Sequence, residues 1–107
     1  MSESPKFGVL FSVRQKARKS NDLVNVVCAK FGSSIRWKER YVMEDSIFDC
    51  HIFRKNVQDP PIYFKEHGNK FSKFLEFYCQ DIEVLQAMKA AFPDVFVGDV
   101  EVKEGLC

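Results

Sequence analysis

The sequence has 107 residues, of which 46% are apolar, 29% charged and 14% aromatic, and its formal net charge is +1. This length suits one domain, residues 1–107, around a single hydrophobic core, and it argues against two domains. No apolar run approaches the roughly 20 residues of a membrane helix, and the first residues do not resemble a signal peptide, so we expect a soluble cytoplasmic protein without membrane contact.

Charged residues are unevenly distributed along the chain. Residues 14–40 contain eight Lys or Arg and two acids, whereas residues 74–107 contain two Lys and seven acids. One end is therefore basic and the other acidic. Such an asymmetry can mark a surface for phosphate or for an acidic partner.

The first predicted element is a strand. Phe7, Val9, Phe11 and Val13 alternate with other residues, which is the period of a strand. Leu10, on the opposite face, indicates that both faces are partly covered. We therefore expect neighbouring strands on both sides.

A basic loop, RQKARKSN at residues 14–21, leads from this strand to a predicted helix. Ser20 or Asn21 can cap the helix, and Asp22 suits the positive end of its dipole. Apolar residues then recur at helical spacing up to Phe31, which predicts three turns.

Two further strands are predicted to form a β-hairpin. SSIRWKERYVM, residues 33–43, and IFDCHIFRK, residues 47–55, both alternate, and MEDS turns the chain between them. Trp37 should point into the core. The opposite, solvent-facing side of the same strand carries Arg36, Lys38 and Arg40.

Residues 56–69 are predicted to form a long loop. Pro60 and Pro61 are incompatible with a helix or a sheet interior, and Gly68-Asn69 marks the end of the segment. A loop of this length is either functional or contains a short edge strand at residues 62–64.

Residues 71–92 can be interpreted in two ways. Their apolar residues step by three or four, which predicts one long amphipathic helix. The segment KFLEFYCQ is rich in strand formers, and Asp81 can cap a shorter helix, so a strand over residues 71–79 is the alternative. We favour the helix. Pro93 ends it in either case, and DVFVGDVEV follows as an alternating strand.

Together these elements predict an α+β fold. The order βαββαβ, with room for an extra strand, corresponds to a ferredoxin-like sandwich. In that fold an antiparallel sheet carries both helices on one face and leaves the other face open.

The candidate binding site combines the basic loop with the helix that follows it. Free backbone N–H groups at a helix N-terminus and the cations of the loop would both attract phosphate. The cations of the hairpin would extend this surface on an adjacent strand. The candidate nucleic-acid-binding residues are therefore Arg14, Lys16, Arg18, Lys19, Arg36, Lys38 and Arg40.

The sequence predicts neither an enzyme nor a bound metal or cofactor. Asp94 and Glu101-Val102-Lys103 have the letters of a metal-dependent nuclease, but the two acids would lie about 23 Å apart on one strand. Cys50 and His51 would face opposite sides of a strand, and the spacing of the Cys and His residues matches no zinc site. The four cysteines contain no CxxC pair and are expected to be reduced thiols.

Two segments resemble a LAGLIDADG homing-endonuclease or maturase half-domain. FSVRQKARKSNDLVNVVCAKFGSSIRW, residues 11–37, is similar to the middle of that half-domain, and IYFKEHGNKFSKFLEF, residues 62–77, is similar to the segment that follows. The family's signature helix, with its metal-binding acid, does not precede the first strand here, so the resemblance does not imply DNA cleavage. It implies that the sheet serves as a nucleic-acid saddle, through Arg14, Lys16, Arg36, Lys38 and Arg40.

The sequence leaves two hypotheses for function. The first is a non-catalytic domain that binds RNA or DNA through the basic loop and the open sheet face. The alternative is a small protein–protein interaction module, such as an inhibitor or accessory subunit. Eleven Phe would then supply a surface that is buried against a larger protein or against a second copy of the chain.

Overall fold

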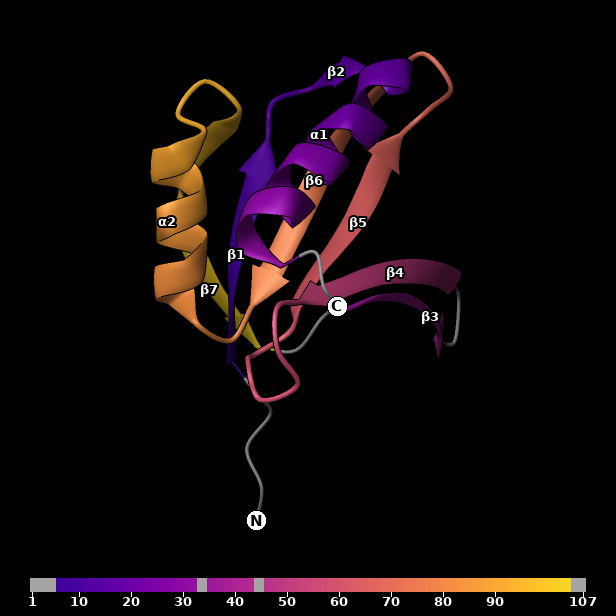
Figure 1. The fold of residues 1–107 in the computed structure, drawn as a ribbon. Coiled ribbons are helices and arrows are strands. Elements are labelled where there is room, and N and C mark those ends of the chain that lie inside the picture. The colour runs from indigo at the N-terminus through magenta and orange to yellow at the C-terminus, as the bar shows by residue number, and fades with distance from the viewer. Residues whose placement is uncertain (1–5, 33–34, 44–45, 105–107) are drawn as a thin grey trace.

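The computed structural model describes residues 6–32, 35–43 and 46–104. They form an α+β fold in which two helices lie against one antiparallel sheet, which confirms the predicted class (Figure 1). The helices are α1 (Ala17–Phe31) and α2 (Ile82–Ala91). The strands are β1 (Lys6–Ser12), β2 (Gln15–Lys16), β3 (Ile35–Met43), β4 (Ser46–Arg54), β5 (Ile62–Gly68), β6 (Ser72–Cys79) and β7 (Phe96–Glu104).

Strand β1 lies in the interior of the sheet. The strand order is β3-β4-β5-β6-β1-β7, with the short β2 paired to β6, and every neighbouring pair is antiparallel. The neighbours of β1 are β6 and β7, which confirms the prediction from Leu10 that strands lie on both sides. Helix α2 connects β6 to β7 and packs on β1 between them.

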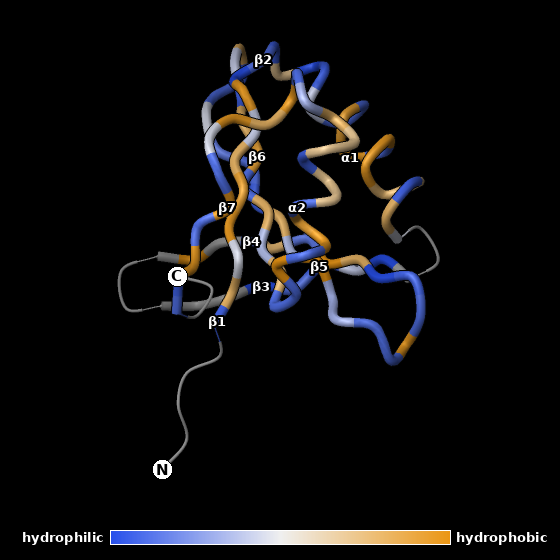
Figure 2. The backbone as a smooth tube through the Cα atoms, turned by 90° about the vertical axis from the view of Figure 1, so that its left-hand side faces the viewer, coloured by the Kyte–Doolittle hydropathy of each residue, from blue (hydrophilic) through white to orange (hydrophobic). Residues whose placement is uncertain are grey.

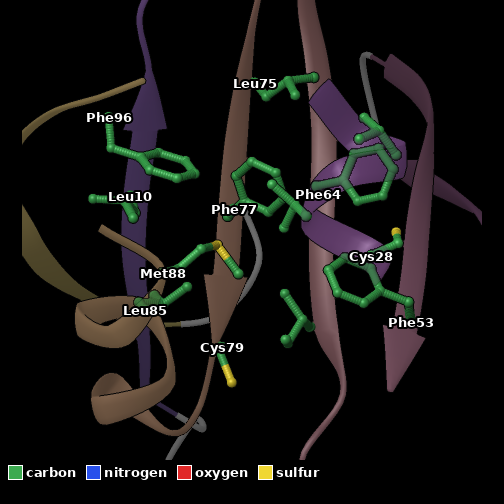
Figure 3. Close-up of a cluster of buried hydrophobic side chains, with 13 residues drawn as sticks. Leu10, Cys28, Phe53, Phe64, Leu75, Phe77, Cys79, Leu85, Met88 and Phe96 are labelled. Carbon is green, nitrogen blue, oxygen red and sulfur yellow. The ribbon is translucent and has the colours of Figure 1, made fainter. Parts of the chain in front are cut away.

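The main hydrophobic core lies between the sheet and both helices, which occupy the same face of the sheet (Figures 2 and 3). Helix α1 contributes Val24, Val27 and Cys28, and α2 contributes Leu85 and Met88. These side chains meet the sheet residues that point toward the helices, which are Leu10, Phe53, Ile62, Phe64, Leu75, Phe77, Cys79 and Phe96. Much of the Phe-rich composition is therefore core.

The favoured helix over residues 71–79 is wrong, because this segment is strand β6. Its alternation places Leu75 and Phe77 in the main core, whereas Tyr78 lies in a separate cluster on the opposite face. A strand that has neighbours on both sides and is covered on both faces buries nearly all of these residues. An amphipathic helix would leave one of its faces in solvent. Helix α2 then begins after Asp81, whose carboxylate accepts a hydrogen bond from the Glu83 backbone N–H, as the alternative interpretation predicted.

The predicted long loop contains a strand that is longer and more central than expected. Strand β5 runs from Ile62 to Gly68 and pairs with both β4 and β6. It is therefore not an edge strand. The two prolines lie immediately before it, where they do not interrupt the hydrogen bonds between strands.

Helix α1 begins earlier than predicted. Its first residue is Ala17, and its N-cap residue Lys16 makes no side-chain capping bond. Ser20 lies inside the helix, where its hydroxyl donates to the Ala17 carbonyl, so neither Ser20 nor Asn21 caps it. Contacts with β6 replace the cap, since the Ala17 N–H donates to the Phe71 carbonyl just before that strand.

The predicted hairpin is confirmed as β3 and β4. Its register runs from Ile35 opposite Arg54 to Met43 opposite Ser46. The hairpin joins the rest of the sheet through three residue pairs of β4 and β5, from His51–Phe64 to Phe53–Ile62. The outer part of the hairpin therefore extends beyond β5.

Candidate functional site

The sheet face opposite the helices is the best candidate for a binding surface, and we call it the open sheet face. Cross-strand neighbours share a face, so the register identifies its members on four strands. They are Phe7, Val9 and Phe11 on β1; Tyr63, Lys65 and His67 on β5; Phe74, Glu76 and Tyr78 on β6; and Val97, Glu101 and Lys103 on β7.

Part of the open sheet face is a small second core. Phe7, Val9 and Tyr78 are buried there, with relative exposures of 5%, 2% and 0%. The ammonium groups of Lys65 and Lys103 lie 5.0 and 5.6 Å from the centroid of the Tyr78 ring and cover it with cations. This part of the face cannot stack a base without rearrangement.

A buried carboxylate lies beside this second core. Glu76 is 8% exposed, and its Oε1 lies 2.9 Å from His67 Nε2 and 3.6 Å from Lys65 Nζ. Burial raises the pKa of Glu76, but hydrogen bonds from Tyr78 and His67 and the charge of Lys65 outweigh burial and lower it below its ordinary value. The carboxylate is therefore ionised at neutral pH and holds the Lys65 ammonium and the His67 ring in place.

Aromatic and cationic side chains meet beyond Glu76, at the end of the face nearest the basic loop. We call Phe11, Arg14, His67 and Phe74 the Phe74 cluster. The His67 ring stacks on Phe74 with centroids 5.0 Å apart, and the Phe11 centroid lies 6.4 Å from Phe74. The Arg14 guanidinium lies 5.2 Å from the same ring. All three rings are partly accessible to solvent.

Arg14 is the member of the basic loop that reaches the open sheet face. Its guanidinium donates to the carbonyl and the hydroxyl of Ser72, at 3.3 and 3.2 Å, which holds it at the end of β6. Lys16, Arg18 and Lys19 are exposed at the start of α1, and the first turn of this helix has no acid. Three cations therefore lie at the positive end of a helix dipole, which is unfavourable until an anion approaches.

The cations of the hairpin do not extend this surface, contrary to the prediction. Strand β3 is at the far edge of the sheet, with β4, β5 and β6 between it and β1. Arg36 lies on the helix side, where it donates to Asn25 of α1 at 3.4 Å. Arg40 and Lys38 pair with Asp49 at 3.0 and 3.9 Å, and the Arg40 hydrogen bond lowers the pKa of that acid.

Trp37 is partly exposed rather than a core residue. It lies on β3 opposite Ile52, and its indole N–H donates to Glu39 at 3.1 Å. The Arg54 guanidinium lies 5.2 Å from its ring. Trp37 alternates with the hairpin cations as predicted, but the two faces are exchanged. Arg36 lies on the helix side of the sheet, so Trp37 lies on the opposite face, away from the main core.

Lys65, His67 and Phe74 were missed by the sequence interpretation. The favoured assignments of their segments were a loop and a helix. The alternation of side chains along a strand could therefore not be used to place them on one face. The alternation in IYFKEHG was the signal that would have found the first two.

The described residues contain no group of three or more His, Cys, Asp or Glu that could hold a metal ion. Cys28, Cys50 and Cys79 are buried free thiols, and burial raises the pKa of each, that of Cys50 to about 11. Such thiols are poor nucleophiles. Cys107 lies outside the described residues.

No protein-family model, no curated protein and no solved structure matches this chain. Within the residues that the structure describes, no helix is long and apolar enough to cross a membrane.

Proposed function

We propose that this chain is a non-catalytic domain that binds single-stranded nucleic acid through the Phe74 cluster and the adjacent basic loop. One observation carries the proposal. Neighbouring strands of the sheet present two partly exposed phenylalanines, Phe11 and Phe74, beside a guanidinium and an imidazole. Exposed aromatic rings and Arg planes on a sheet face are the groups on which unpaired bases stack.

The charges around the cluster support a path for the backbone. Arg14 lies at the cluster, and Lys16, Arg18 and Lys19 follow directly in the chain toward and into the first turn of α1. A strand whose base stacks at Phe74 can extend its phosphates toward these cations and the positive end of the helix dipole. This arrangement also accounts for a basic first turn without a capping acid.

We further infer that the core of the fold is ferredoxin-like. Strands β5, β6, β1 and β7 are consecutive in the sheet, and with α1 and α2 they supply the order βαββαβ. The β3–β4 hairpin is then an insertion between α1 and β5 that extends the sheet. In this interpretation Phe11 and Phe74 lie on the two central strands of the four-stranded core.

The alternative, a Phe-rich surface for a protein partner, has less support. Among the described side chains, one phenylalanine is largely exposed, Phe71 at 73%. The other exposed large apolar residues are distributed over α1, β4, the following loop and β7, namely Val26, Ile47, Val57, Val97 and Val102.

Two substitutions at one position test the proposed function. Phe74→Leu keeps an apolar side chain but removes the stacking ring, whereas Phe74→Tyr keeps the ring. Loss of one stacked base costs about 1–3 kcal/mol, so we expect Phe74→Leu to weaken binding of fluorescein-labelled U12 or dT12 about tenfold or more. Phe74→Tyr should bind within about twofold of the wild type.

Fluorescence anisotropy at low salt measures these affinities, with circular dichroism as the check that both variants fold. Wild-type protein that binds neither oligonucleotide at 50 mM salt would end the proposal. Equal oligonucleotide affinities of the Leu and Tyr variants would show that the Phe74 ring does not stack on a base.

A further inference from the structure

The outer edge of β7 has no neighbouring strand within the described part of the chain. An exposed edge presents backbone N–H and C=O groups that can pair with another extended chain. Two exposed apolar side chains lie on this strand, Val97 at 47% and Val102 at 59%. The strand has nine residues, and its pairing with β1 shifts register between Val97 and Glu101, so the regular part of the edge is Glu101–Glu104.

A groove lies beside this edge, between β7 and α2. Its volume is about 480 Å³, and Ala90, Pro93 and Val100 give it an apolar lining, with Gln86, Lys89 and Asp99 as the polar members. Lys89 of α2 reaches across to β7, where it donates to the Gly98 carbonyl and pairs with Asp99 at 3.1 Å. The groove can accept a side chain of moderate size from a segment that pairs with β7.

Charge indicates what kind of segment fits there. Strand β7 carries Asp99, Glu101 and Glu104 against one cation, Lys103. Glu101 and Glu104 are exposed, and neither takes part in an ion pair among the described residues. A second copy of β7 would bring two acidic edges together, whereas a cationic strand would be attracted to this one.

We propose that β7 and the groove beside it bind an extended, cationic segment of a partner protein as an additional strand of the sheet. The backbone of the segment pairs with the outer edge of β7. An aliphatic side chain enters the groove beside Val100, and Lys or Arg side chains at alternate positions lie beside Glu101. The acidic end of the chain, which the Phe74 cluster does not use, thus has a role of its own.

A fluorescein-labelled peptide, Lys-Val-Lys-Val-Lys-Val-Lys, tests strand addition with the wild-type protein. Two analogues carry N-methyl groups on either the Val or the Lys backbone nitrogens, with identical side chains. In an added strand, residues of one parity point their N–H groups at β7. We expect the unmodified peptide to bind, one analogue to lose at least tenfold in affinity and the other to retain it. Equal affinities of the two analogues, or no binding of the unmodified peptide at 1 mM, would overturn the proposal.

Charge reversal tests the position. Glu101→Lys should weaken binding of the unmodified peptide at least tenfold, whereas Asp22→Lys, the same change of charge on an exposed residue of α1, should leave it within twofold. Equal losses would mean non-specific attraction and would overturn the proposal. So would sedimentation of the wild type as a dimer that Glu101→Lys dissociates, because a second copy would then occupy the edge.

Discussion

At the scale of single residues, Glu76 is the charged side chain on which the open sheet face depends. It is 8% exposed and is held between His67 and Lys65, whose own side chain is 14% exposed. Removing one member of such a buried pair leaves the other without compensation. The carboxylate is therefore needed to keep the Lys65 ammonium and the His67 imidazole beside the rings of the face.

The stability of Glu76→Gln should reveal this role. We expect the variant to lose about 1–3 kcal/mol of unfolding free energy at pH 7, because the buried ion pair with Lys65 and the hydrogen bond with His67 are weakened. Interactions in the folded state lower the pKa of Glu76, so the unfolded chain takes up the proton first as pH falls. The wild type should therefore have the larger free energy of unfolding at pH values above 4.5, the ordinary pKa of Glu, and this difference should shrink at lower pH.

Urea unfolding at pH 7 and pH 3 measures this difference. Glu66→Gln is the matched control, because Glu66, on the neighbouring strand β5, pairs with Lys73 at a more exposed position. We expect that substitution to change stability by less than about 1 kcal/mol at both pH values. A deficit of Glu76→Gln that is as large at pH 3 as at pH 7 would contradict the account.

Cys50 should contribute to stability in the alkaline range. It is 1% exposed, and burial raises its pKa from 9.0 to about 11. The unfolded chain loses this proton first as pH rises, so the contribution is complete below pH 9 and is lost toward pH 11, by about 1.4 kcal/mol per pH unit. The wild-type advantage over Cys50→Ala should shrink across that window. An advantage that stays constant from pH 8 to pH 11 would show that the thiol is not desolvated.

The sequence predicted some residues of the site and missed others for an identifiable reason. Arg14 was predicted because the cluster of cations at residues 14–19 can be recognised in the sequence without knowledge of the fold. His67 and Phe74 become neighbours through the pairing of β5 with β6, which brings residues opposite each other across a turn. The favoured assignments were a loop and a helix, and strands at residues 62–64 and 71–79 were the alternatives, so the sequence did not predict this contact.

At the scale of elements, the alternation of residue types along the chain decided which strands could be predicted. The hairpin β3–β4 and the strand β1 alternate clearly, and both were predicted. Strand β6 is covered on both faces, so from Leu75 to Cys79 it reads as a continuous buried run rather than an alternating one. A run of this kind fits a helix equally well until its partners are known.

The packing of α2 on β1 gives a prediction for this scale. A Cβ added at Gly8 would meet Leu85 of α2 at 2.9 Å and Ile82 at 3.1 Å. We expect Gly8→Ala to cost about 1–3 kcal/mol, because the Leu85 and Ile82 side chains must move in a well-packed core. Thermal unfolding measures the loss. A variant as stable as the wild type would show that α2 does not lie this close to β1.

At the scale of the whole molecule, the two groups of cations lie at different places. The basic loop lies beside the open sheet face, whereas Lys38 and Arg40 are at the far edge and are paired with Asp49. The chain's net charge of +1 conceals this separation. A nucleic-acid strand should therefore use one basic group and not the other.

The salt dependence of oligonucleotide binding tests this separation. Each phosphate contact on a single strand contributes about 0.7 to the slope of log affinity against log salt. We expect Arg14→Glu with Lys16→Glu and Arg18→Glu to reduce the slope by about 2. The triple variant Arg36→Glu, Lys38→Glu and Arg40→Glu, with the same change of net charge, should keep the wild-type slope. Equal reductions in both variants would mean diffuse attraction rather than a site.

Amide chemical-shift mapping with unlabelled U12 or dT12 tests the central claim most directly, because it locates the contact without any substitution. We expect the largest changes at residues 11–19, 65–67 and 72–76, which surround the Phe74 cluster and the start of α1, and little change in β3 and β4. Changes concentrated on the hairpin, or no changes at 50 mM salt with excess oligonucleotide, would contradict binding through the open sheet face.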